Sequence, residues 1–390
     1  MHYYKPKQLH DGKGYCPEGS ILSVESDGTI HAILRSDDVT SDDVQELDGI
    51  LCPGFINTHC HLELSHMRGM LDEHTGLIPF IKGVLAKRAA PTEVIEEAIR
   101  ACDREMRENG IVAVGDISNT SDTFNRKQES DIYYHTFVEI FHLDPREAEN
   151  TLKVGTDLMA ELGNRNLSGS LAPHAPYTVS PELFRLISTF NDGHNPITSM
   201  HNQETWAENE FFMTKSGSFQ LFFDQWGIDT SAFQSTGTKS LPGVIHNMSP
   251  KGKTLLVHNT FSEQDDIQLA KRWFEEVYWC SNPNANLYIE NNLPNYDVFV
   301  ENNAVMTLGT DSIASNWQLS ILEEVKTIHT RFSHIPLERL LTWATAHGAQ
   351  MLNIDHQFGT FKPGKKPGLV HISNFENGNL TNQSKPTRLR

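Results

Sequence analysis

The stretch Pro53-Gly-Phe-Ile-Asn-Thr-His-Cys-His-Leu-Glu63 decides how the whole chain is interpreted. Apolar residues lead into two histidines, His59 and His61, that are separated by one residue. Side chains of a β-strand alternate between its two faces, so a strand over residues 55–62 would point both imidazoles the same way. Two imidazoles on one face at the end of a buried strand can share a metal ion. The stretch therefore predicts a metal site at a strand end.

The composition excludes several classes of protein. The 390 residues are enough for one large α/β barrel and a small accessory domain. With 50 acidic and 32 basic residues the net charge is −18, which disfavours nucleic acid and anionic membranes as partners. The five scattered cysteines form no CxxC motif and favour a reducing compartment. Because the chain shows neither a signal-peptide pattern nor an apolar run of membrane-spanning length, we expect a cytoplasmic protein.

Strand-like and helix-like segments alternate from the quoted stretch onward. Seven further strand-like segments lie at 111–117, 132–141, 167–174, 196–201, 254–258, 277–281 and 304–311. Helical apolar spacing occurs between them, for example over residues 93–109 and 181–191. Eight strands with intervening helices are the count of a (β/α)8 barrel. We therefore predict an α/β fold with a (β/α)8 TIM barrel over residues 53–353.

Both ends of the chain have a different pattern from the barrel. Short β-type runs at 20–24 and 29–34 are separated by Asp27-Gly28, a dipeptide typical of a β-hairpin turn. After the barrel the sequence returns to β-type runs set between glycines and prolines. We predict that residues 1–52 and 354–390 pair into one small β-sandwich domain built from both termini.

A long insertion, residues 205–253, separates the fifth and sixth predicted strands. It is rich in aromatic residues, among them Trp206, Phe211, Phe222 and Phe223. One interpretation is a helical excursion that packs its own small core. The other is a lid that shapes a substrate pocket, because long barrel loops often carry function. Both interpretations stay open on the sequence alone.

Polar residues recur at the carboxyl ends of the predicted strands, which is where barrels of this kind carry their active sites. Besides His59 and His61, these residues are His174, His201, His258 and Asp311. Three imidazoles and one carboxylate are a sound ligand set for Zn²⁺ or Fe²⁺, with one position left for water. Such a metal lowers the pKa of bound water to about 7. Glu204, shortly after His201, would stand beside that water as a general base and acid.

Five short motifs resemble the amidohydrolase superfamily. They are Pro53-Gly-Phe-Ile-Asn-Thr-His-Cys-His61, His174-Ala-Pro-Tyr-Thr178, His201-Asn-Gln-Glu204, Val257-His258 and Gly309-Thr-Asp-Ser312. Within that superfamily they are similar to the mononuclear deaminase and chlorohydrolase branch. This branch includes deaminases of S-adenosylhomocysteine, methylthioadenosine and aminodeoxyfutalosine. The binuclear branch carries a bridging lysine after the fourth strand, and no lysine stands at 170–176, so one metal ion is expected.

The resemblance implies a role for each residue at the strand ends. The metal ligands would be His59, His61, His201 and Asp311. The catalytic residues would be Glu204 as proton shuttle, His258 as the group that orients the water, and Asp311. The substrate-binding residues would be His174 and Glu204. The implied cofactor is one divalent metal ion, with zinc as the first choice and iron as the alternative.

These residues together predict a metal-dependent hydrolase that deaminates an aminated purine or an adenosine-type nucleoside. Metal-bound hydroxide would attack the carbon that bears the amine, and Glu204 would deliver protons to the departing ammonia. A cyclic amide hydrolase or a chlorotriazine-type hydrolase would use the same site. A catalytically silent barrel that binds a metal or a nucleobase is a further alternative. The expected partner is a small molecule, and the resemblance suggests a homodimer.

Overall fold

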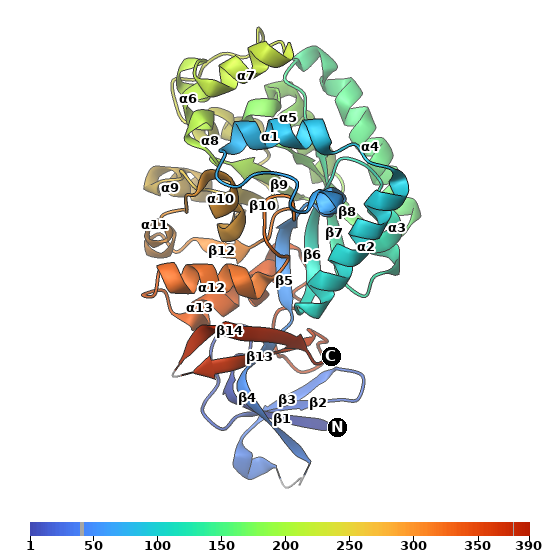
Figure 1. Ribbon diagram of the computed structural model, residues 1–390, viewed down its shortest axis with the longest axis vertical. Coiled ribbons are helices and arrows are strands. Elements are labelled where there is room, and N and C mark those ends of the chain that lie inside the picture. The colour runs from blue at the N-terminus through green and yellow to red at the C-terminus, as the bar shows by residue number, and fades with distance from the viewer. Residues whose placement is uncertain (40–42, 377) are drawn as a thin grey trace.

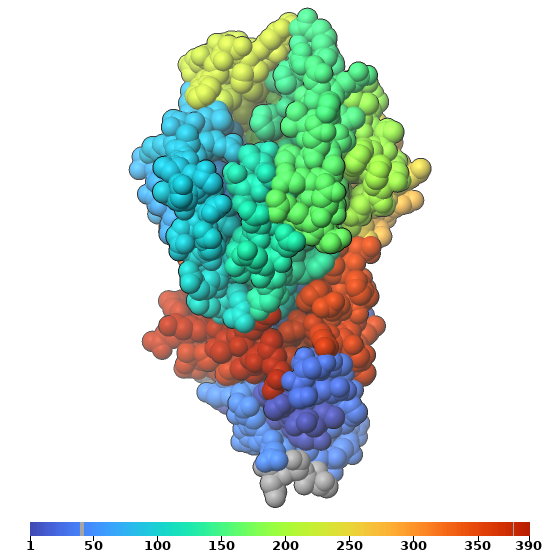
Figure 2. Space-filling view, turned by 90° about the vertical axis from the view of Figure 1, so that its right-hand side faces the viewer, coloured from blue at the N-terminus to red at the C-terminus, as the bar shows by residue number. Residues whose placement is uncertain are grey.

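The computed structural model describes residues 1–39, 43–376 and 378–390. The chain forms a large barrel at one end of its long axis and a smaller β-domain, which carries both termini, at the other (Figure 1). Figure 2 shows the C-terminal segment between the barrel and the N-terminal strands. In the described parts of the chain, no helix is long and apolar enough to cross a membrane.

Eight parallel strands form the barrel, in two four-stranded sheets ordered β5-β6-β7-β8 and β9-β10-β11-β12. The strands are β5 Phe55–Cys60, β6 Ile111–Ser118, β7 Tyr133–Ile140, β8 Ser168–Pro173, β9 Ile197–Asn202, β10 Lys253–His258, β11 Glu276–Ser281 and β12 Val305–Leu308. Backbone hydrogen bonds join the two sheets at both seams. The N–H of His201 donates to the carbonyl of His174 at 2.9 Å, and the N–H of Asp311 donates to the carbonyl of His59 at 3.0 Å. The predicted (β/α)8 TIM barrel is confirmed.

Helices surround the barrel (Figure 1). They are α1 Leu77–Lys87, α2 Thr92–Glu108, α3 Phe124–Glu129, α4 Ala148–Asn164, α5 Pro181–Asp192, α9 Gln264–Trp273, α10 Pro283–Glu290, α11 Tyr296–Glu301, α12 Ile321–Arg331, α13 Leu337–Thr342 and α14 Gly348–Met351. Helix α2 buries Ile99, Cys102 and Met106, whose spacing places them on one face. The last two helices are separated by a π-helical turn, Trp343–His347.

The insertion between β9 and β10 is helical and has its own aromatic core. Its helices are α6 Trp206–Thr214, α7 Ser218–Trp226 and α8 Ser240–Val244. Phe211, Phe219 and Phe223 are fully buried, and the rings of Phe211 and Phe233 stack with their centroids 4.3 Å apart. Nζ of Lys82 on α1 donates to Oε1 of Gln225 on α7 at 2.8 Å. The insertion is therefore attached to α1, at the carboxyl end of the barrel (Figure 1).

The β-domain is one six-stranded sheet, ordered β14-β13-β4-β1-β2-β3. Its strands are β1 His2–Leu9, β2 Ile21–Val24, β3 Ile30–Leu34, β4 Val44–Pro53, β13 Leu369–Glu376 and β14 Asn379–Arg388. The hairpin predicted at Asp27-Gly28 joins β2 to β3, and Gly28 has a φ of 89°. The pairing of β4 with β13 confirms that both termini build one domain. The boundaries at 52/53 and 353/354 stay a prediction.

Gly54 connects the β-domain to the barrel. Strand β4 ends at Pro53 and β5 begins at Phe55, so Gly54 lies where the chain passes from one domain to the other. A Cβ atom at this position would lie 2.3 Å from the side chain of Val112 and 2.8 Å from the carbonyl of Pro367. Only glycine fits this close approach without displacing its neighbours. The strand that carries the paired histidines is thereby fixed at its start by both domains.

Candidate metal centre and active-site cavity

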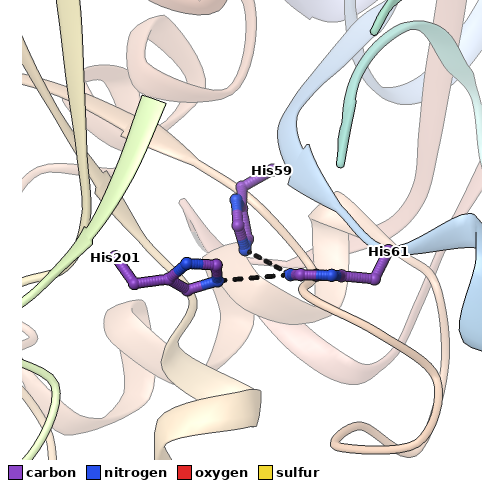
Figure 3. Close-up of side chains that lie close together, drawn as sticks. All are labelled: His59, His61 and His201. Atoms are coloured by element: carbon purple, nitrogen blue, oxygen red, sulfur yellow. Dashed lines mark hydrogen bonds between the residues drawn. The ribbon is translucent and has the colours of Figure 1, made fainter. Parts of the chain in front are cut away.

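The four predicted metal ligands converge at the carboxyl end of the barrel. His59 ends β5 together with Cys60, His61 follows directly, His201 lies in β9, and Asp311 follows β12. Figure 3 shows the three imidazoles pointing at one another. Nε2 of His61 is 3.2 Å from Nε2 of His59 and 3.3 Å from Nε2 of His201. Oδ1 of Asp311 is 3.5 Å from Nε2 of His59 and 3.4 Å from Nε2 of His61.

These separations fit one divalent metal ion. A tetrahedral site with metal–nitrogen bonds of about 2.0–2.1 Å holds its ligand atoms about 3.3–3.4 Å apart. The four separations lie between 3.2 and 3.5 Å. Two neutral imidazoles that face each other through their Nε2 atoms can form at most one hydrogen bond between them. Hydrogen bonding alone therefore does not account for the convergence of three rings. A cation bound by the imidazole nitrogens would account for this convergence.

Strained backbone places one of the predicted ligands, Asp311, and the neighbouring His258 at the strand ends. His258 and Asp311 have φ angles of 68° and 58°, in the left-handed region that non-glycine residues rarely adopt. The N–H of Asp311 donates to the carbonyl of His59, which fixes the residue against β5. Oγ of Ser315 donates to Oδ2 of Asp311 at 2.6 Å. Oδ1 is left to face the imidazoles.

A buried ion pair behind β5 fixes the chain after His61. Nζ of Lys127 lies 2.6 Å from Oδ2 of Asp116, and both side chains are fully buried. Oδ1 of Asp116 accepts a hydrogen bond from the N–H of Leu62 at 2.8 Å. A buried carboxylate without a partner is costly, and Lys127 supplies the balancing charge. The direction of the chain directly after the second histidine is therefore set by this pair.

Hydrogen bonds fix the orientation of His201. Its Nδ1 donates to the backbone carbonyl of His174 at 2.8 Å, which leaves the lone pair of Nε2 for the ligand cluster. His174 itself has its ring centroid 4.9 Å from that of His201, and its Nδ1 is 2.7 Å from Oγ1 of Thr178. Burial lowers the pKa of His174 to about 4, so the ring is neutral at pH 7. Its contact with substrate stays a prediction.

Glu204 and His258 form a second pair beside the ligand cluster. Oε1 of Glu204 lies 3.7 Å from Nε2 of His258. Nδ1 of His258 donates to Oδ1 of Asn286 at 2.8 Å, so its Nε2 faces Glu204 without a proton. Burial lowers the pKa of His258 to about 4. Burial and the charge of Asp311 raise the pKa of Glu204 well above its ordinary value, so this carboxyl readily takes up a proton.

The ligand cluster opens into a cavity of about 570 Å³. The predicted site residues that line it are His61, His174, His201, Glu204, His258 and Asp311. Much of the remaining wall is apolar and comes from α1 and the insertion: Leu77, Phe80, Val84, Phe222, Phe223 and Ile228. The insertion therefore combines both features considered from the sequence, an aromatic core of its own and one wall of the pocket.

Comparison with known proteins decides the family. The model of the amidohydrolase family matches residues 50–386. The chain belongs to the amidohydrolase family. Its sequence is 26% identical over 354 residues to the 5′-deoxyadenosine deaminase of Methanococcus maripaludis, an alignment that covers 86% of this chain and 78% of the relative.

Solved structures of deaminases have the same fold as this amidohydrolase. The aminofutalosine deaminase of Helicobacter pylori, in complex with methylthio-coformycin, superposes with a TM-score of 0.81 at 21% identity, over 99% of this chain and 97% of that one. An adenosine deaminase of Xanthomonas campestris with bound zinc superposes with a TM-score of 0.73 at 19% identity, over 95% and 84% of the two chains. At least one known protein of this fold therefore holds zinc.

Five polar residues near the site were not among the predicted site residues: Glu63, Arg88, Asn119, Glu139 and Asn286. Four of them line the cavity, and Asn286 holds His258. Glu139 stands near the carboxyl end of a predicted strand, the same signal that identified His174, and Glu63 closes the stretch quoted first. Asn119 lies in the loop after β6, where asparagines are common for purely local reasons, and Asn286 lies in α10 close to Asn282 and Asn284, so the sequence signal of both is weak.

Proposed function

We propose that this amidohydrolase is a metal-dependent deaminase of an aminated purine or an adenosine-type nucleoside. The observation that carries the proposal is the convergence of four ligand atoms beside the Glu204–His258 pair, at the floor of one large cavity. The relatives that act on 5′-deoxyadenosine and aminofutalosine support the same class of substrate. The proposed partner is thus a small molecule. A homodimer and a cytoplasmic location stay predictions.

We assign the metal to His59, His61, His201 and Asp311. Their donor set, three imidazole nitrogens and one carboxylate oxygen, suits zinc first and Fe²⁺ as the alternative. The zinc in the Xanthomonas campestris neighbour supports the first choice. When bound, such an ion supplies Lewis acidity and lowers the pKa of water to about 7.

The proton transfers belong to Glu204 and His258. The unprotonated Nε2 of His258 accepts a hydrogen bond from the attacking water and so orients it, while Asn286 holds the ring. Glu204 takes a proton from that water as the new carbon–oxygen bond forms. It then gives the proton to the amine as the carbon–nitrogen bond breaks, and ammonia leaves. The raised pKa of Glu204 suits it to carry a proton in this way at neutral pH.

Asp311 and His174 complete the proposed site. Asp311 would offer Oδ1 to the metal, while Oγ of Ser315 donates to its Oδ2. His174 lies beside His201 in the cavity wall, where its ring can contact a purine. The apolar surface of α1 and α7 beyond these residues suits a nucleoside with an apolar 5′ group.

Ammonia release from a panel of compounds tests the proposal. Zinc-loaded protein is incubated with adenosine, 5′-deoxyadenosine, methylthioadenosine, S-adenosylhomocysteine, aminodeoxyfutalosine and guanine, with chelated protein as the control. We expect ammonia from at least one adenosine-type nucleoside and none from the control. Metal-loaded protein that releases no ammonia from the whole panel would overturn the proposal and favour amide or chloride hydrolysis. Protein that binds no metal would favour a silent barrel.

A further inference from the structure

Four polar side chains form a connected group in the cavity wall beside the proposed metal site. Both oxygens of Glu63 are engaged: Oε1 lies 3.3 Å from Nη2 of Arg88, and Oε2 accepts the N–H of Asn119 at 2.8 Å. Nδ2 of Asn119 donates to Oε2 of Glu139 at 3.0 Å. Asn119 therefore bridges two glutamates that come from different strand ends and line the same cavity.

The second oxygen of Glu139 lacks a good donor. Oε1 of Glu139 lies 3.4 Å from Nδ1 of His201, and that nitrogen already donates to the carbonyl of His174 at 2.8 Å. The described residues offer Oε1 no shorter hydrogen bond. Glu139 is 5% exposed and Glu63 is 4% exposed, yet both contribute to the cavity surface. Glu139 lines the cavity, so a ligand hydroxyl placed there can supply the donor that Oε1 lacks.

We propose that Glu63 and Glu139 bind the two adjacent hydroxyls of the substrate's ribose. This inference rests on the proposed function, because it presumes a nucleoside in the cavity. A hydroxyl donates one proton, and a carboxylate accepts it without any change of charge. Two neighbouring carboxylates joined by Asn119 match two neighbouring hydroxyls. Arg88 keeps the group from holding two uncompensated negative charges in a buried place.

The same charges argue against an anionic group at this position. Among the described residues that line the cavity, Arg88 is the only lysine or arginine, and it is already paired with Glu63. Glu63, Glu139, Glu204 and Asp311 surround the same space with carboxyl groups. A neutral sugar avoids the repulsion that a carboxylate or phosphate would meet. The subsite thus selects a ribonucleoside by its hydroxyls.

Catalytic efficiency toward matched nucleosides tests the subsite. For wild-type protein, kcat/KM is measured with adenosine, 2′-deoxyadenosine and 3′-deoxyadenosine, and the same is done for Glu63→Gln and Glu139→Gln. Hydrogen bonds to charged groups predict that wild-type protein prefers adenosine to at least one deoxy analogue by roughly 10- to 100-fold. In the two variants this preference should shrink to a few-fold. Glu129→Gln, an exposed glutamate on α3, should keep the wild-type ratio.

The ratio of kcat/KM for adenosine to kcat/KM for a deoxy analogue distinguishes two roles of Glu139. One is binding of the substrate's hydroxyls, and the other is purely structural support of His201. A structural role of Glu139 would lower the efficiency toward all three nucleosides equally and leave their ratio unchanged, which would contradict the proposal. Equal wild-type efficiency toward adenosine and both deoxy analogues would contradict it as well. Metal content is measured for each variant so that loss of the ion is recognised.

Titration calorimetry measures the binding of the nucleosides directly, so this second test does not require turnover. Metal-loaded Glu204→Gln is titrated with the same three nucleosides. Tighter binding of adenosine than of a deoxy analogue supports the subsite even if wild-type protein releases no ammonia, in which case only the proposed function fails. Equal binding of all three, or binding of none, overturns the subsite.

Discussion

At the level of single residues, the proposed catalysis depends on which side chains carry protons, and Glu204 is the first of them. Glu204→Gln keeps the shape of the side chain and removes its ability to carry a proton. General acid–base groups contribute about 10²–10⁴-fold, so we expect kcat to fall by that factor. The metal content should stay unchanged, because Glu204 is not among the proposed ligands. Ammonia release and metal analysis on the same preparation check both points. Ammonia release at the wild-type rate would remove Glu204 from the mechanism.

Asn286 should act through His258. Asn286→Leu removes the acceptor for Nδ1 of His258, so the ring loses the hydrogen bond that fixes its orientation. Loss of such an outer partner typically costs about 10- to 100-fold in activity. Asn286→Asp keeps an acceptor oxygen and should retain more activity than the leucine variant. If both variants match wild-type kcat, the orientation of His258 does not depend on Asn286.

The convergence of the proposed ligand residues could be predicted from the sequence, whereas their supporting groups could not. His59 and His61 stand two apart in an apolar run, and the alternation of a strand alone brings them to one face. His201 and Asp311 follow further strand-like runs, and parallel strands of a barrel end on one side. Glu63 and Glu139 become neighbours only through Asn119, which the tertiary fold places between them. A local pattern contains no sign of that bridge.

Among the elements of the insertion, helix α7 and the residues directly after it line the pocket. Phe222 lines the cavity, whereas Leu221 on the same helix is 62% exposed. Phe222→Ala should lower kcat/KM for methylthioadenosine by roughly 10-fold, through lost apolar contact with the 5′ group. The effect on adenosine should be smaller. Leu221→Ala is the matched control and should leave both values unchanged.

The Tm of each variant distinguishes loss of contact from loss of fold. Phe222 also packs against Phe223 and Trp226, so its removal can loosen α7. A selective effect on methylthioadenosine at an unchanged Tm supports the role of α7 in the pocket. Equal losses for both nucleosides would contradict that role.

The first and last strands of the chain, β1 and β14, were the hardest part of the fold to predict. Strand β14 is polar along its length and contains Pro386, which is typical of a sheet edge and carries little strand signal. Strand β1 contains Pro6, and its pairing with β4 shifts register between Pro6 and Gln8. By contrast β6, buried at every residue, reads as an apolar run and was predicted within one residue of its observed bounds.

In the whole molecule, both domains contribute to the position of the site residues. The barrel collects side chains from strands separated by more than two hundred residues, and the β-domain holds the start of β5 through Gly54. The insertion closes one side of the cavity with α7. Chemistry therefore lies at one end of the barrel, and the sheet made by both termini lies at the other (Figure 1).

A metal titration with ammonia release as its readout shows whether the proposed site works with one metal ion. Chelated protein receives increasing amounts of zinc, and turnover of the best nucleoside from the panel is followed. If His59, His61, His201 and Asp311 together hold one metal ion, as proposed, activity should be absent at the start and should reach its plateau at one equivalent of zinc. Activity that survives chelation, or that needs two equivalents, would contradict the account of a single metal centre formed by these four residues.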